Sequence, residues 1–75
     1  MSQLSDRILS ISTTYLGPAA KTFLERQCQS HLGLNFENMD KAHQAELAKW
    51  VGISAALVID EAKAKELASL VEKTF

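Results

Sequence analysis

The sequence predicts an all-α protein, folded as one compact bundle of four helices in a single domain over residues 1–75. Apolar residues recur at intervals of three and four along most of the chain, which is the period of an amphipathic helix. No segment alternates apolar and polar residues as a half-buried strand would. Glycine, proline and aspartate interrupt the helical pattern and divide it into four segments, which are residues 3–16, 18–32, 40–58 and 61–74.

The first helix is predicted by a stripe that begins with Leu4, Ile8 and Ile11. The dipeptide Gly17-Pro18 interrupts this stripe. Proline is unfavourable inside a helix but favourable at its first position, where its missing N–H would have had no partner within the helix. We therefore expect one helix to end near residue 16, a second to begin at residue 18, and the two to meet at a sharp angle.

The second helix has Phe23, Leu24 and Cys28 on its apolar face. Gly33 follows it and is a natural C-cap, because glycine adopts the left-handed conformation without steric cost. We expect Cys28 to be a small core residue, since cysteine is often buried in this way. The apolar residues of the loop over residues 34–38 are expected to fold back onto the core.

The third helix is predicted over residues 40–58, with Asn38 or Asp40 as its N-cap. Trp50 lies in the middle of its apolar stripe and is expected to anchor the core. Gly52 lies inside the helix, and we interpret it as a point where another helix approaches closely. Residues 52–59 are apolar or small on all sides, so this end of the helix is expected either in the core or under a partner.

The fourth helix is predicted to begin after Asp60, a favourable N-cap, with Glu61 in its first turn at the positive end of the helix dipole. Its polar positions carry both lysine and glutamate. This mixture is typical of a solvated outer face and differs from the basic face of a membrane-binding helix.

Composition excludes several classes of protein. The chain has 75 residues, of which 47% are hydrophobic, and 8 basic against 9 acidic residues give a net charge of −1. Intrinsic disorder is excluded because it needs low hydrophobicity and high net charge. A disulfide scaffold is excluded because it needs more than one cysteine. Basic residues are scattered, so we expect no nucleic-acid partner. We likewise expect no membrane partner and no small-molecule substrate. The lone cysteine and the absence of a secretory or membrane-spanning pattern predict a cytoplasmic location.

Cys28, His31 and His43 are the residues that could carry chemistry. The first two are three positions apart and share a helix face. Zinc usually takes four ligands from paired cysteine and histidine positions, and these three fall short of that number. A catalytic thiol would need an activating base and an oxyanion hole, and only the base has a candidate. We expect no enzyme activity, no catalytic or metal site and no cofactor, and keep a metal or thiol protein as an alternative.

Six residues are the candidates for a protein interface. Some are polar residues within apolar stripes, which would suit the rim of an interface or the edge of the core. Others are apolar or small residues behind the stripe of the third helix, or the apolar C-terminal residue. The candidates are Gln27, His31, His43, Ile53, Ala56 and Phe75. The partner could be another protein or a second copy of the chain, since small domains are often stabilised by oligomerisation.

Residues 15–26, YLGPAAKTFLER, resemble a Gly-Pro-Ala segment in small helical domains of bacterial signalling proteins. Those domains are appendages of response regulators and Ser/Thr kinases, and short free-standing cyanobacterial proteins of unknown function look similar. The resemblance covers about a dozen residues. It implies a regulatory or docking module, and it assigns no active-site residue to this chain.

The sequence therefore predicts a non-enzymatic, cytoplasmic protein–protein interaction module with a regulatory role. A small subunit or assembly factor of a larger complex is the alternative. In that case a partner would cover residues 52–59.

Overall fold

The computed structural model describes residues 3–74 and is all helical, with no strand in that range. Three long, regular α-helices account for most of it: α1 (Gln3–Leu16), α3 (Lys41–Ala55) and α4 (Glu61–Lys73). The all-α class is therefore confirmed. The expected four regular helices are not found in the described residues, because the second segment is a composite of short helical pieces.

The composite segment consists of η1 (Gly17–Ala19), α2 (Ala20–Gln27) and η2 (Cys28–Leu32). Its first piece is a tight 3₁₀ turn that contains Pro18, and its last is a wider π-helical turn. The π turn is closed by the N–H groups of Gly33 and Leu34, which both donate to the carbonyl of Cys28. These bonds span five and six residues, so they favour a wider turn than the four-residue bonds of an α-helix. The expectation of one regular helix over residues 18–32 is therefore wrong.

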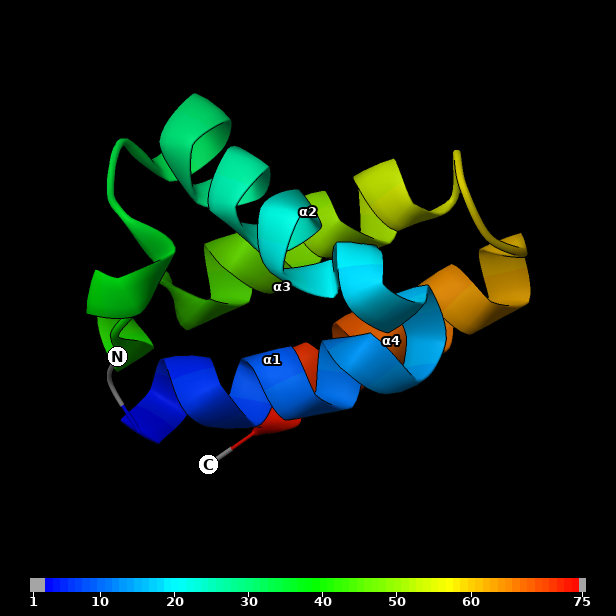
Figure 1. Cartoon of the computed structure of the whole chain (residues 1–75), viewed down its shortest axis with the longest axis horizontal. Coiled ribbons are helices and arrows are strands. Elements are labelled where there is room, and N and C mark those ends of the chain that lie inside the picture. Colours follow the sequence, from blue (N-terminus) through cyan, green and yellow to red (C-terminus); the bar gives the residue numbers. More distant parts are fainter. Residues whose placement is uncertain (1–2, 75) are drawn as a thin grey trace.

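Two glycines reverse the chain at either end of this composite segment. Gly17 has φ +64° and Gly33 has φ +66°, and both lie in the left-handed region that favours glycine. Gly17 ends α1 at the residue where the sequence predicts a joint, and the chain turns sharply there (Figure 1). Gly33 acts as the C-cap that was expected at this position.

Side-chain caps fix the starts of the two long C-terminal helices. Asp40 accepts a hydrogen bond from the backbone N–H of His43, and Asp60 accepts one from Ala62. Between them, α3 ends at Ala55, three residues before the predicted end at residue 58. A turn over residues 56–59 follows, because Asp60 must adopt an extended ψ in order to cap α4. The start and end of α4 agree with the prediction to within one residue.

The helices form a ring around one core. α4 packs along α3 and also contacts α1, whereas α2 and η2 connect α1 to α3 (Figure 1). The short helix η3 (Phe36–Asn38) returns the loop toward α1 and buries Phe36, as expected. The core contains Leu4, Ile8, Leu24, Cys28, Phe36, Met39, Leu47, Ala48, Val51, Ala55, Ala64, Leu67 and Val71. No helix within residues 3–74 is long and apolar enough to cross a membrane.

Candidate functional site

Large aliphatic side chains are exposed where α3 ends and the following turn begins. Ile53 is 52% exposed, Leu57 is 85% exposed and Val58 is 67% exposed. Ile59, the last residue of the turn, packs partly against the core and anchors it. We call Ile53, Ala56, Leu57 and Val58 the apolar tip. The apolar end of the third predicted helix is thus mostly outside the core, which answers one question that the sequence left open.

A shallow groove runs from the apolar tip along the outer side of α3 and α4. The two helices approach closely at Gly52, where a Cβ atom would stand 3.1 Å from the Cβ of Ala68. This close approach agrees with the interpretation of Gly52 from the sequence. The groove holds an open hollow of about 420 Å³, lined by Ala48, Lys49, Gly52, Ile53, Ala56, Glu61, Lys65 and Ala68.

The groove continues past Ala48 toward the opposite end of the helix pair. A second hollow of about 180 Å³ there is lined by Ala45, Ala48, Lys49, Ala68, Ser69 and Glu72. Its floor is again made of small residues, and its rim is charged. The whole groove therefore has an apolar floor between charged edges, and Ile53 and Ala56 of the apolar tip lie at one end of it.

Gln27 and His31, the polar residues of the second predicted helix, both contact α3. Gln27 is buried, and its Oε1 accepts a hydrogen bond of 3.0 Å from the hydroxyl of Ser54. The His31 ring stacks on Trp50 with centroids 3.8 Å apart. Gln27 therefore joins two helices within the fold and does not lie on an exposed rim. His31 is exposed and does not line the groove.

His43 lies at the start of α3, away from both of these contacts. Its Nδ1 is 2.7 Å from a carboxylate oxygen of Asp40. This hydrogen bond lowers the pKa of the Asp40 carboxyl, because it stabilises the charged form. The pair reinforces the N-cap of α3, so the structure gives His43 a role in helix capping.

Cys28 is fully buried in the core, as expected from the sequence. Burial raises the pKa of its thiol to about 11, which leaves little thiolate at neutral pH. Cys28, His31 and His43 thus have three different environments. Within residues 3–74, no three His, Cys, Asp or Glu side chains come together as a group that could hold a metal.

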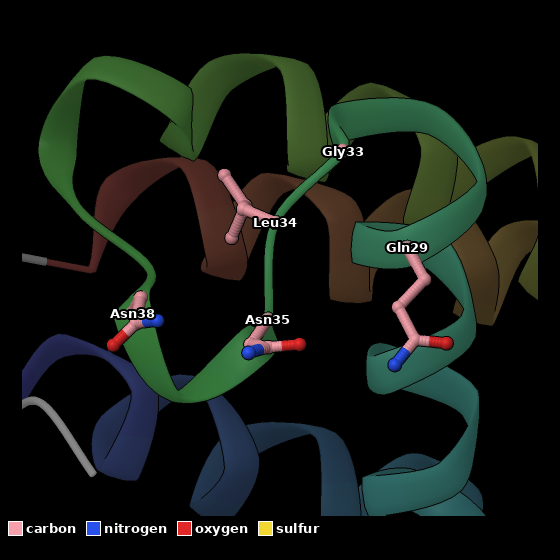
Figure 2. A pocket seen from close by; sticks show the side chains of 5 residues that line it. All are labelled: Gln29, Gly33, Leu34, Asn35 and Asn38. Carbon is pink, nitrogen blue, oxygen red and sulfur yellow. The ribbon is translucent and has the colours of Figure 1, made fainter.

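A separate hollow of about 580 Å³ lies beside the loop between η2 and η3 (Figure 2). Gln29, Asn35 and Asn38 present amide groups around it, with Gly33 and Leu34 completing the lining. All three amide side chains belong to exposed residues. They are uncharged and are not held in place by burial, so the hollow does not indicate a particular class of ligand.

A further hollow of about 380 Å³ lies between α1 and α4 and is lined by Thr14, Tyr15, Ile59, Lys63 and Glu66. The Tyr15 hydroxyl donates a hydrogen bond of 2.5 Å to Glu66. This bond raises the pKa of Tyr15, because it stabilises the protonated phenol. The contact ties α1 to α4.

Of the six candidate residues, the structure brings only Ile53 and Ala56 together, in the groove. Phe75 lies outside the described residues. The sequence prediction did not identify Leu57 and Val58 as exposed. The N-cap at Asp60 was the available signal, since an extended capping residue requires the preceding helix to end earlier.

Comparison with known proteins gives no relative. No family model, curated protein or solved structure matches the chain.

Proposed function

We propose that the chain is a non-enzymatic protein–protein interaction module, and that the apolar tip is its contact surface. The exposure of Leu57 is the observation that carries the proposal. A single exposed leucine is ordinary on a protein surface, but an apolar patch next to a groove is typical of an interaction site. Burying one such side chain against a partner stabilises a complex by about 1.5–3 kcal/mol.

The module is proposed to act in the cytoplasm and to have a regulatory role. The unpaired Cys28 supports a reducing compartment. The resemblance of residues 15–26 to helical appendages of bacterial signalling proteins supports regulation. That segment forms the joint between α1 and α2 and contributes Leu24 to the core, so it would supply the scaffold and not the contact surface.

A small subunit or assembly factor of a larger complex is the second candidate. The same observation favours it, because a permanent partner would cover the apolar tip continuously. The two candidates differ in whether the partner dissociates during purification. A regulatory partner should exchange during purification, whereas the partner of a subunit should co-purify in a fixed ratio.

Affinity capture from a native extract tests the proposal. The bait is the wild-type chain, the double variant Leu57→Asp/Val58→Asp, or the control Leu70→Asp. Leu70 is 41% exposed and lies on α4 outside the groove. Leu70→Asp therefore controls for the replacement of an exposed leucine away from the proposed contact surface. We expect proteins that bind the wild type and the control but not the double variant, with equal helix content in all three by circular dichroism. Identical captured sets for all three baits would contradict the proposal.

A further inference from the structure

The charges along the groove between α3 and α4 are complementary to those of a second copy of the same surface. Its rim carries Lys49 on α3 and Glu61, Lys65 and Glu72 on α4, so positive and negative charges are equal in number. A strongly acidic or strongly basic partner would find no complementary field here. A second copy of the same surface would find one.

The order of the charges on α4 determines how two copies would fit. Glu61 and Lys65 are one helical turn apart on the same edge of the groove, and their side chains already pair at 3.5 Å. In an antiparallel arrangement about a two-fold axis level with Lys63, Glu61 of each chain would face Lys65 of the other. A two-fold interface uses the same patch twice, so each such contact occurs twice.

This arrangement also provides a place for the apolar tip. Gly52 lies opposite Ala68 and α3 runs antiparallel to α4, so Ala56 is about level with Ala64, close to the axis (Figure 1). Ile53 and Ala56 line the same hollow as Glu61 and Lys65. The tips of the two chains would thus cover each other beside the axis.

We infer that the apolar tip and the adjoining end of the α3–α4 groove bind a second copy of this chain in an antiparallel two-fold dimer. The inference rests on the proposed function and names the partner of the same surface. A weak interface of this kind buries about 600 Å² on each chain, which is about one seventh of the 4390 Å² that the chain exposes.

Sedimentation velocity over a concentration series up to about 500 μM tests the inference with the purified chain of residues 1–75. The wild type should shift with concentration from 8.3 kDa toward twice that mass. Ile53→Glu should weaken dimerisation at least about tenfold, because it places a charge on the apolar floor. Leu70→Asp, outside the groove, should leave dimerisation unchanged. Circular dichroism checks that each variant keeps its helix content.

A charge exchange tests the orientation. Glu61→Lys and Lys65→Glu should each weaken the dimer, because each places like charges opposite one another across the two-fold axis. The double variant exchanges the two charges and should recover most of the lost affinity. The double variant also restores the Glu61–Lys65 pair within each helix, so urea unfolding of each variant is compared with its dimer affinity. Recovery of dimer affinity beyond the recovery of stability is specific to the pairing between chains.

Three results would overturn the inference. The first is a wild-type chain that is monomeric throughout the series. The second is a dimer that persists in Ile53→Glu but is lost in Leu70→Asp, and the third is a double charge variant weaker than both single variants. A monomer that still captures other proteins through Leu57 would leave the proposed function standing. A monomer without such capture would overturn both.

Discussion

The His31 ring lies flat on the indole of Trp50, with an interplanar angle of 4°. Lys49 approaches the same indole, with its Nζ 5.3 Å from the ring centroid. Trp50 is therefore half-buried and covered by neighbouring polar side chains. The sequence predicts a core anchor at this position, and the structure corrects that expectation. Trp50 lies at the edge of the core, where η2 meets α3.

His31→Ala should expose the face of Trp50 that the imidazole now covers. We expect a red shift in tryptophan emission, stronger quenching by acrylamide and a loss of about 1 kcal/mol in the free energy of unfolding, as for other stacked aromatic pairs. His43→Ala is the matched control, because His43 contacts Asp40 instead. Equal emission from the two variants would show that the stack does not persist in solution.

The Gln44 side chain should stabilise the C-terminal end of α4. Its side-chain amide donates to the carbonyl of Val71 at 2.8 Å, to that of Glu72 at 3.2 Å and also to that of Thr74. These are carbonyls at a helix C-terminus, which have no partner within the helix. Gln44→Ala should lower the free energy of unfolding by about 1–3 kcal/mol.

Gln44→Glu extends this test. The carboxylate has nearly the same shape but no donor, and it would face carbonyl oxygens. We expect it to destabilise the protein more than alanine does, as measured by urea unfolding. A smaller loss for glutamate than for alanine would contradict the assigned hydrogen bonds.

Gly52 should tolerate only a small side chain. Alanine would improve the helix propensity of α3 by about 1 kcal/mol, but its Cβ would lie 3.1 Å from that of Ala68. The two effects oppose each other, so we expect Gly52→Ala to be nearly neutral. Gly52→Val should instead push the helices apart and cost about 1–3 kcal/mol. Combining it with Ala68→Gly should cost less than the sum of the two single changes, which a double-mutant cycle measures.

Local features of this fold can be read from the sequence, and tertiary ones cannot. The cap at Asp60 and the turn at Gly33 depend on residues within one or two helical turns, so their positions are correctly predicted. The half-exposed state of Trp50 depends on where His31 arrives from another element. The π-helical turn is local as well, since its bonds join Cys28 to Gly33 and Leu34, but the apolar spacing of the segment does not distinguish it from an α-helical turn.

The candidate site shows the same limit. The spacing of Ile53 and Ala56 places them behind the apolar stripe of α3, and the structure places both in the groove. Gln27 has an equally clear polar signal but is buried against Ser54, because its partner lies on another helix. Leu57 and Val58 fit the helical period and yet lie beyond the end of the helix. Apolar periodicity alone does not show where a helix stops.

The last prediction concerns stability at high pH. Burial raises the pKa of Cys28 to about 11, whereas in the unfolded chain the thiol has its ordinary value near 9. The folded state therefore keeps its proton at pH values where the unfolded state loses it. The contribution of the protonated thiol to the free energy of unfolding is complete below pH 9 and is lost as the pH rises toward 11. By pH 10 the free energy of unfolding should have fallen by roughly 1 kcal/mol from this group alone.

Cys28→Ala isolates this effect, because every other titrating group is common to both proteins, including Tyr15 with its own raised pKa. Urea unfolding at pH 8 should show the wild type to be more stable, since alanine leaves a small cavity in the core. At pH 10 the difference between the two proteins should narrow by roughly 1 kcal/mol. An unchanged difference at the two pH values would mean that the thiol ionises as readily in the folded chain as in the unfolded one. Cys28 would then be accessible to water, which contradicts its place in the core.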